Sequence, residues 1–224
     1  MLQEAIEQLR RGRPVLLFDF EDREGETDFV FPATHITPAD IRLMRKEGGG
    51  LICVAIHPEA ASRLSLPLIS DVLLRCGGDI ASLVERRGDL RYDSRSSFSL
   101  WVNHRSVFTG IPDRDRALTI REIGNAVERV MRGEHYVFHE HFRTPGHVAI
   151  LRASEGLLES RRGQTELSVA LAMMAHITPA MAICEMLDDE SGNALSKDAA
   201  KRYARLKGIP FVEGSEVVRA YKNA

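Results

Sequence analysis

An acidic segment near the N-terminus is the part of the sequence best suited to chemistry. Six of the ten residues from Asp19 to Asp28 are acidic, Glu24 and Glu26 among them, and they follow an apolar run that begins at Val15. Carboxylates this close repel one another and call for a positive partner, and hard cations such as Mg²⁺ take oxygen ligands. The spacing does not fit the calcium loop of an EF-hand. A solvated acidic turn is the alternative interpretation.

Four histidines lie in the segment HYVFHEHFRTPGHV, the first of them His135. His139 and His141 would share a face if this segment were a strand, which would supply half of a Zn²⁺ site. Surface or satisfied core positions are the more common situation for clustered histidines. Pro145-Gly146 predicts a tight turn that places His147 at the entrance of the next apolar strand. His147 is therefore a candidate general acid or base.

The segment RRGQTE, residues 161–166, leads into a predicted helix. Gly163 lets the backbone approach a ligand, the start of the helix offers free N–H groups, and Arg161 and Arg162 add positive charge. This combination suits a phosphate group. The alternative is ordinary helix capping by Thr165, with both arginines in solvent.

Glu185 stands inside the apolar run AICEML. A carboxylate is costly to bury without a partner, and desolvation raises its pKa toward the range of a general acid or base. A glutamate that points to solvent from an edge strand is the alternative.

Composition limits the function classes. The chain has 224 residues, 44% of them hydrophobic, and a formal net charge of -2. These values indicate a globular core and exclude a general attraction to nucleic acid or anionic membranes. We expect no membrane span, and the acidic N-terminal residues are unlike a signal or transit peptide. The three cysteines, Cys53, Cys76 and Cys184, form neither a disulfide framework nor a CxxC site, so we expect a cytoplasmic location.

These side chains need elements to position them. Apolar runs predict strands at Val15–Phe20, Asp28–Ala33, Leu51–Ile56, Phe98–Asn103, His147–Arg152, Ala182–Leu187 and Ile209–Val212. Helical spacing and capping signals predict helices at Leu2–Leu9, from Thr37 to the Gly48–Gly50 stop, from a Thr119 capping box to about Gly133, and at Thr165–Ile177, Ser196–Lys207 and Ser215–Tyr221.

Strands that alternate with helices in the last third predict parallel βαβ units there. The strand–loop–strand around Gly25 predicts antiparallel pairing as well, and Ser106–Gly110 is a candidate partner for the strand before it. Residues 65–95 have no clear period and receive no assignment. The predicted fold class is α/β (α+β), a single-domain sandwich of a mixed β-sheet covered by helices, over residues 1–224.

Four long motifs in this order resemble one family closely. They are EDREGETD, FRTPGHVAILRA, RRGQTELSVALA and CEMLDDESG, and they look like those of 3,4-dihydroxy-2-butanone 4-phosphate synthase. SSFSLWVNHRSVFTGI and ALSKDAAKRYA look like the archaeal, monofunctional type. The resemblance runs from about Val15 to the C-terminus. It implies conversion of D-ribulose 5-phosphate to 3,4-dihydroxy-2-butanone 4-phosphate and formate in riboflavin biosynthesis, with Mg²⁺ or Mn²⁺. It also implies an α/β sandwich and a homodimer with sites near the subunit interface.

The resemblance carries over to individual positions. Those that match the family's catalytic residues are His147, Glu185 and Glu26. Those that match its substrate- and phosphate-binding residues are Arg23, Glu24, Asp28, Arg161, Arg162, Gly163, Gln164, Thr165 and Glu185. Glu24 and Gln164 match the positions that bind the metal in the family. Asp19 and Cys53 match positions in the acidic loop and the pocket.

One position departs from the family pattern. The family usually has His in its GHTE segment as the second protein ligand of the metal, and this chain has Gln164 there. A Gln offers a carbonyl oxygen but no imidazole nitrogen, and a hard cation tolerates that oxygen. The alternative function is therefore a catalytically impaired homologue that binds sugar phosphate. A nucleotide- or RNA-binding module is a weaker alternative, because the charge is near neutral and no basic aromatic stripe is present.

Overall fold

The computed structural model describes residues 1–223. The strands are β1 (Val15–Phe18), β2 (Thr27–Pro32), β3 (Cys53–Ile56), β4 (Phe98–His104), β5 (Phe142–Arg152), β6 (Ala180–Glu185) and β7 (Phe211–Glu213). The α-helices are α1 (Leu2–Arg10), α2 (Pro38–Leu43), α3 (Pro58–Arg63), α4 (Ile69–Cys76), α5 (Gly78–Ser82), α6 (Asp113–Met131), α7 (Phe138–His141), α8 (Gln164–Met174), α9 (Lys197–Lys207) and α10 (Gly214–Tyr221). Short turns of other helix types are η1 (Ala33–His35), η2 (Met44–Gly48) and η3 (Leu157–Glu159).

All of these strands belong to one mixed sheet in the order β4-β5-β3-β6-β2-β1-β7. β3 runs parallel to β5 and β1 runs parallel to β7, whereas β6 is antiparallel to both of its neighbours, β3 and β2. The mixed sheet of the predicted α/β fold is thereby confirmed. β6 is a central strand, so Glu185 at its end does not lie on a sheet edge, and the solvent-facing alternative for this residue is wrong.

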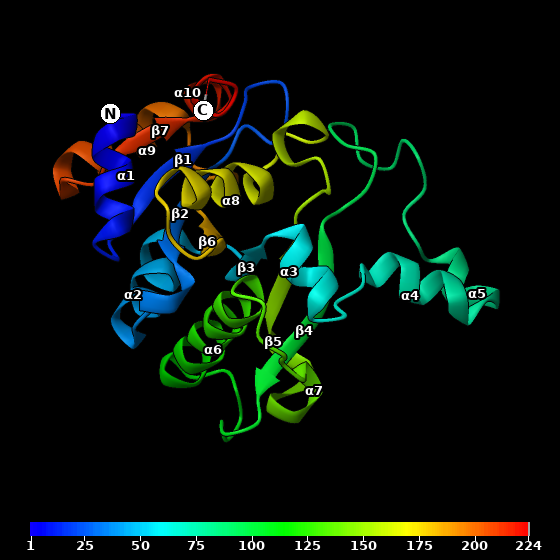
Figure 1. Ribbon diagram of the computed structural model, residues 1–224. Helices are drawn as coiled ribbons and strands as arrows, with labels where there is room; N and C mark the ends of the chain where they lie inside the picture. The colour runs from blue at the N-terminus through cyan, green and yellow to red at the C-terminus, as the bar shows by residue number, and fades with distance from the viewer. Residues whose placement is uncertain (224) are drawn as a thin grey trace.

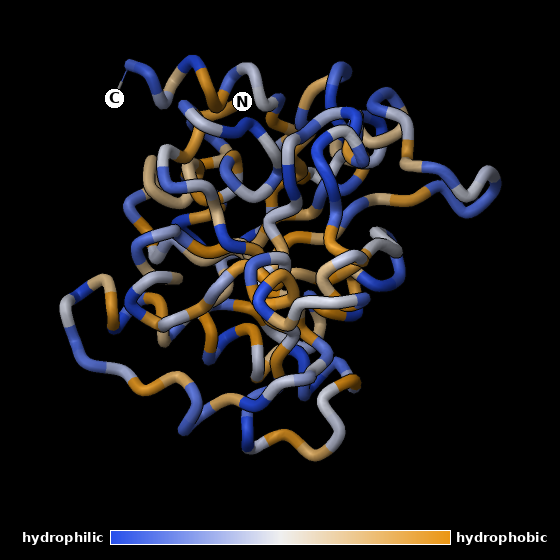
Figure 2. Tube along the Cα trace, turned by 90° about the vertical axis from the view of Figure 1, so that its right-hand side faces the viewer, coloured by the Kyte–Doolittle hydropathy of each residue, from blue (hydrophilic) through white to orange (hydrophobic). Residues whose placement is uncertain are grey.

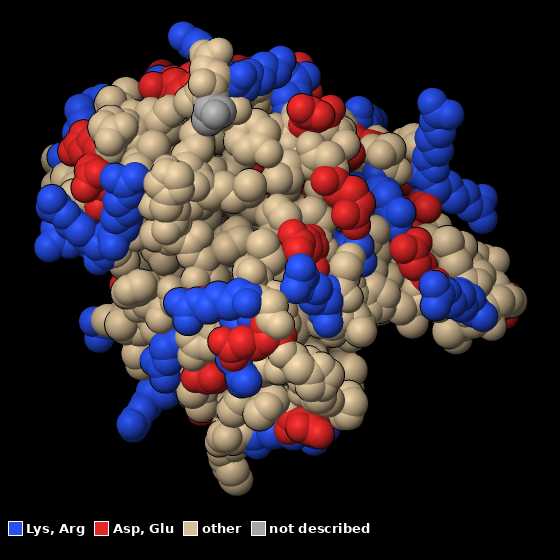
Figure 3. Space-filling model, viewed as in Figure 1, with Lys and Arg blue, Asp and Glu red and all other residues tan. Residues whose placement is uncertain are grey.

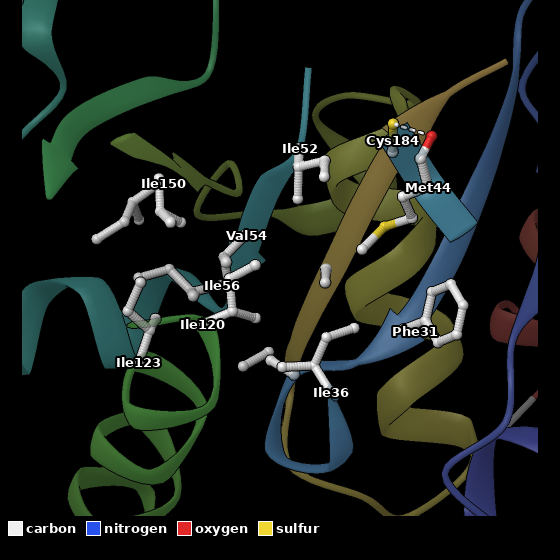
Figure 4. Packing of buried hydrophobic residues seen from close by; sticks show 14 of the residues in the cluster. Phe31, Ile36, Met44, Ile52, Val54, Ile56, Ile120, Ile123, Ile150 and Cys184 are labelled. Atoms are coloured by element: carbon white, nitrogen blue, oxygen red, sulfur yellow. Dashed lines mark hydrogen bonds between the residues drawn. The ribbon is translucent and has the colours of Figure 1, made fainter. Parts of the chain in front are cut away.

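Helices cover both faces of the sheet (Figure 1). One core cluster combines the long helix α6 with α2 and α3, and includes Ile120, Ile123 and Met44 (Figure 4). The other combines α1 and α8 with the opposite face, and includes Leu9, Leu167 and Leu171. α8 is apolar on nearly all sides because it lies between the sheet and the helices α1 and α10. Figure 2 shows apolar segments in the middle of the molecule, whereas its protruding segments carry both hydrophilic and hydrophobic stretches.

The last third of the chain does not form the predicted run of parallel βαβ units. β5 and β6 point in opposite directions, and β6 and β7 are separated by β2 and β1. Strand direction depends on pairing with β3, β2 and β1, which lie far away in the sequence. The local alternation of strands and helices does not contain that information.

Several local predictions are corrected. α6 begins at Asp113 and not at Thr119, so the predicted capping box is wrong; the Thr119 hydroxyl accepts a hydrogen bond from the His104 backbone N–H at 3.1 Å. Residues 106–110 form a turn without strand pairing. His139 and His141 lie in the short helix α7 and not on one face of a strand.

The start of β5 also differs from the prediction. The strand begins at Phe142, and Pro145-Gly146 forms part of an irregularity in its pairing with β4 in place of a turn before the strand. The unassigned residues 65–95 contain α4 and α5, neither of which buries a residue, followed by an irregular segment that returns to β4. In Figure 1 these two helices extend away from the sheet.

Candidate active site

A cavity of about 330 Å³ lies where four distant parts of the chain meet. They are the acidic segment between β1 and β2, the end of β6, the start of α8, and the irregular segment between α5 and β4. The lining includes the predicted residues Arg23, Glu24, Glu26, Asp28, Cys53, Arg161, Gln164, Thr165 and Glu185. Nine residues selected from separate motifs are thus brought together by the fold.

Asp19 shapes the acidic segment from within. Its buried carboxylate accepts the backbone N–H of Glu24 at 3.1 Å and that of Glu26 at 3.0 Å. These two bonds curl the chain around Gly25, whose φ of +68° suits a glycine. Asp19 is not itself part of the cavity lining. It orients Glu24 and Glu26 toward the cavity.

Four carboxylates that line the cavity have raised pKa values. Burial is the largest cause at Glu24, Glu26, Asp28 and Glu185. Neighbouring carboxylates add to it: Asp19 beside Glu24, Glu24 beside Glu26, and Glu185 beside Asp28. The pKa of Glu26 rises to about 7. Ionisation of these carboxylates is therefore unfavourable without a positive partner, which favours a bound cation.

A glycine turn holds Glu185 in position. The Glu185 Oε2 atom accepts the Leu51 backbone N–H at 2.8 Å, and its backbone carbonyl accepts the N–H of Gly50 at 3.1 Å. A Cβ atom at Gly50 would lie 2.3 Å from Glu185 Oε2, so only glycine fits there. The turn at Gly50 and Leu51 thus positions the carboxylate of Glu185, which lies more than a hundred residues later in the sequence.

Arg161 lines the cavity and lies just before the start of α8. Its Nη1 atom donates to Glu166 Oε2 at 2.6 Å, and its Nε atom donates to Asp93. Asp93 also accepts from Arg23 Nη2 at 3.1 Å. A Cβ atom at Gly163 would lie 2.2 Å from Arg161 Nη1, so this glycine leaves room for the guanidinium group. Both cavity arginines therefore share one carboxylate partner.

Gln164 is the first residue of α8 and is buried. Its Nε2 atom donates to the backbone carbonyls of Leu17 and Glu26, each at 3.1 Å, and its Oε1 atom has no hydrogen-bond partner within the described residues 1–223. The two bonds fix the direction of the amide, so Oε1 is a buried acceptor that lacks a donor. The cap of α8 is Gly163 without a side-chain bond, so the alternative of capping by Thr165 is wrong.

The oxygen atoms of the side chains that line the cavity suit a hard divalent cation as ligands. Carboxylate oxygens and the unpartnered Gln164 Oε1 are the ligand types that Mg²⁺ takes, and Mg²⁺ retains several waters in protein sites. Among residues 1–223, no three His, Cys, Asp or Glu side chains are arranged as a metal-binding group. The predicted Zn²⁺ half-site at His139 and His141 therefore gains no third ligand. Glu140 separates the two histidines in the sequence. The ring of His141 stacks on that of Tyr136, with 4.8 Å between the ring centroids.

Three further predicted residues, Arg162, Gly163 and His147, lie outside the cavity lining. Arg162 is exposed, with its guanidinium 5.3 Å from the Phe20 ring. His147 is exposed at the irregular part of β5, and its polar contacts are to Asn103 of β4. The cavity of one chain therefore does not include His147.

The sequence analysis missed the contribution of the segment before β4. Leu90, Tyr92 and Ser96–Phe98 line the cavity, and Arg23 lies 5.6 Å from the Tyr92 ring centroid. This segment has no periodic pattern, and its contacts are to residues about 70 positions away. The sequence signal there is weak: Asp93 is one of several charged residues in a segment rich in arginine.

Charges of both signs are interspersed over the face drawn in Figure 3, as the near-neutral composition predicts.

In the described part of the chain, none of the helices has both the length and the apolar character that a membrane crossing requires.

Comparison with known proteins gives a consistent result. A family model described as 3,4-dihydroxy-2-butanone 4-phosphate synthase matches residues 3–220. A relative of that name from Archaeoglobus fulgidus is 56% identical over 98% of this chain and 93% of its own length. One from Methanothermobacter thermautotrophicus is 44% identical over 99% of this chain and 96% of its own length. A crystal structure of a 3,4-dihydroxy-2-butanone 4-phosphate synthase in complex with two magnesium ions is similar, with a TM-score of 0.81 and 26% identity over all of this chain and 97% of that one.

Proposed function

The chain belongs to the 3,4-dihydroxy-2-butanone 4-phosphate synthase family, and we propose that its acidic cavity converts D-ribulose 5-phosphate to 3,4-dihydroxy-2-butanone 4-phosphate and formate. This is a reaction of riboflavin biosynthesis. The observation that carries the proposal is the convergence of Glu24, Glu26, Asp28 and Glu185 with Arg161 in one cavity. The cavity thereby combines acid–base groups with the positively charged guanidinium group of Arg161.

Each part of the substrate has a complementary group. The phosphate fits beside Arg161, Arg23 and the free N–H groups at the start of α8. Substrate phosphate would compete with Asp93 for the two arginines. The sugar carbonyl and hydroxyls would then face the carboxylates of the acidic segment and β6.

Glu185 and Glu26 are suited to move protons. Enolisation of a sugar phosphate needs a base beside one carbon and an acid beside the carbonyl oxygen. Burial raises the pKa of Glu185, and it raises that of Glu26 to about 7, so Glu26 can exchange protons near neutral pH and the Glu185 carboxylate is a stronger base than an exposed glutamate. Asp28, whose pKa burial raises strongly, is suited to donate a hydrogen bond to the substrate.

Glu24 and Gln164 would hold the divalent cation, Mg²⁺ or Mn²⁺, through their oxygen atoms. The ion, when bound, polarises the sugar carbonyl and hydroxyls and stabilises negative charge on them. The unpartnered Oε1 atom of Gln164 supports this assignment, because an acceptor without a donor suits a cation. Gln164 is thus compatible with an active metal site, and the impaired-homologue alternative has no observation in its favour beyond the substitution itself.

The position of His147 outside the cavity of its own chain favours a homodimer. The resemblance assigns it to catalysis, yet it lies outside the cavity of its own chain. Near it, Phe108 is 94% and Ile111 52% exposed on the turn after β4. We propose that these apolar side chains pack against a second copy and that the His147 of one protomer acts at the cavity of its partner. We propose residues 1–224 as one domain of such a dimer in the cytoplasm.

Glu185→Gln tests the acid–base assignment. Gln keeps the acceptor for the Leu51 N–H but cannot exchange a proton, so we expect turnover to fall by roughly 100-fold or more. Binding of ribulose 5-phosphate, measured by calorimetry, should stay within about threefold. Near-normal formate release by this variant would contradict the assignment.

A further inference from the structure

Asn103 of β4 lies beside His147 and is only 2% exposed. Its Oδ1 atom accepts the His147 backbone N–H at 2.8 Å. Its Nδ2 atom donates to the Thr109 carbonyl at 3.2 Å and lies 3.1 Å from His147 Nδ1. One buried amide therefore connects the strand, the turn after it and the imidazole ring.

Two glycines bring the backbone close to this amide. A Cβ atom at Gly146 would lie 2.0 Å from the Val102 carbonyl carbon, and one at Gly110 would lie 2.2 Å from Asn103 Nδ2. Gly110 also has a φ of +102°, which L side chains rarely adopt. These two glycines thus allow both backbone segments to pack against the Asn103 region. This close packing leaves the Asn103 side chain little freedom to rotate.

The backbone partners fix which end of the amide is which. The His147 N–H can only donate, so it faces Oδ1, and the Thr109 carbonyl can only accept, so it faces Nδ2. Nδ2 carries two hydrogens, and Thr109 takes one of them. The second points to an acceptor at His147 Nδ1, 3.1 Å away.

The other arrangement is less favourable. A hydrogen on His147 Nδ1 would face Oδ1 at 3.3 Å, where a backbone N–H is already accepted. It would also oppose an Nδ2 hydrogen that has no other partner in a buried position. Hydrogen-bond accounting therefore favours Nδ1 as an acceptor and the imidazole proton on Nε2.

We propose that Asn103 is a positioning residue that holds neutral His147 in the tautomer with its proton on Nε2. Neutral His147 then presents a hydrogen-bond donor, and not a proton acceptor, to the reacting atoms. This inference rests on the proposed catalytic role of His147. Such a donor polarises a carbonyl oxygen and stabilises the negative charge that enolisation places on it.

The test is nitrogen NMR of the full-length protein labelled with ¹⁵N-histidine, above the pH at which the imidazoles are protonated. We expect His147 to show a bare Nδ1 and a protonated Nε2. In Asn103→Asp a carboxylate replaces the Nδ2 donor, so the proton should move to Nδ1. His57, whose Nδ1 accepts the Glu59 N–H at 3.2 Å, is the internal reference and should not change.

Kinetics of the same variant test the consequence. We expect kcat of Asn103→Asp for ribulose 5-phosphate to fall about tenfold or more, with KM changed by less than about twofold. Asn193→Asp, in an exposed turn, is the matched control and should behave as wild type.

Three results would overturn the inference. They are a wild-type His147 with its proton on Nδ1, an Asn103→Asp spectrum without the shift, and a shifted tautomer with unchanged kcat. The wild-type spectrum is decisive even if the variant fails to fold. It also needs no turnover, so a failure of the proposed lyase activity would be seen separately in the formate assay.

Discussion

At the scale of single residues, Gln164 decides how the metal is held. Its amide nitrogen donates to two backbone carbonyls, and its buried Oε1 atom has no hydrogen-bond partner among residues 1–223. The sequence indicated an oxygen ligand in place of an imidazole. The orientation of that oxygen could not be predicted, because it depends on the carbonyls of Leu17 and Glu26, about 140 positions away.

Gln164→His tests this position directly. An imidazole at the start of α8 would provide the ligand that the family usually has, so we expect Mg²⁺ to bind about tenfold more tightly. The measurement is a calorimetric Mg²⁺ titration of the purified variant beside wild type, without substrate. Glu216→Gln, in the first turn of α10 and away from the cavity, serves as the control. An unchanged titration would contradict a place for Gln164 at the metal.

At the scale of elements, β7 and α10 are connected to α9 through Glu213. This residue ends β7, precedes α10, and accepts from Lys201 at 2.7 Å, while Lys197 lies 3.0 Å from its other oxygen. The hydrogen bond from Lys201 is the largest cause that lowers the pKa of Glu213 below 4.5. The sequence predicted the strand and both helices, because their apolar spacing and the Ser196 cap are local, but not this contact between them.

Glu213→Gln should destabilise the protein in a pH-dependent way. A carboxylate whose folded pKa is depressed stabilises the fold above its unfolded pKa and loses that effect as the pH falls through the folded pKa. We therefore expect a loss of about 1 kcal/mol at pH 7, near 2–4 °C in Tm, that disappears at an acidic pH below the folded pKa of Glu213. Glu7→Gln, which breaks an exposed pair with Arg10, should show almost no loss at either pH. Equal losses for Glu213→Gln at both pH values would refute the charge-based explanation in thermal melts.

At the scale of the whole molecule, the sheet order places the acidic segment, the end of β6 and the start of α8 around one cavity. Motif order identified those residues, since each motif is contiguous. Three features could not be predicted from motif order. The antiparallel position of β6 and the path of the segment before β4 depend on pairings between distant residues, and so does the separation of His147 from the cavity.

Mixing two inactive variants tests the dimer. If His147 acts in the partner's cavity, a heterodimer of His147→Ala and Glu185→Gln contains one intact site and one doubly defective site. Statistical mixing by co-expression should then restore roughly a quarter of wild-type formate release. No recovery, with heterodimers verified by mass spectrometry, would contradict the contribution of the partner subunit.

Formate release shows directly whether the acidic cavity with Gln164 forms a working metal-dependent lyase. The purified protein is incubated with D-ribulose 5-phosphate and Mg²⁺, and formate is quantified with and without EDTA. We expect formate and the four-carbon phosphate in equal amounts, abolished by EDTA and restored by added Mg²⁺. Absence of formate from protein that still binds ribulose 5-phosphate would contradict the proposed lyase activity.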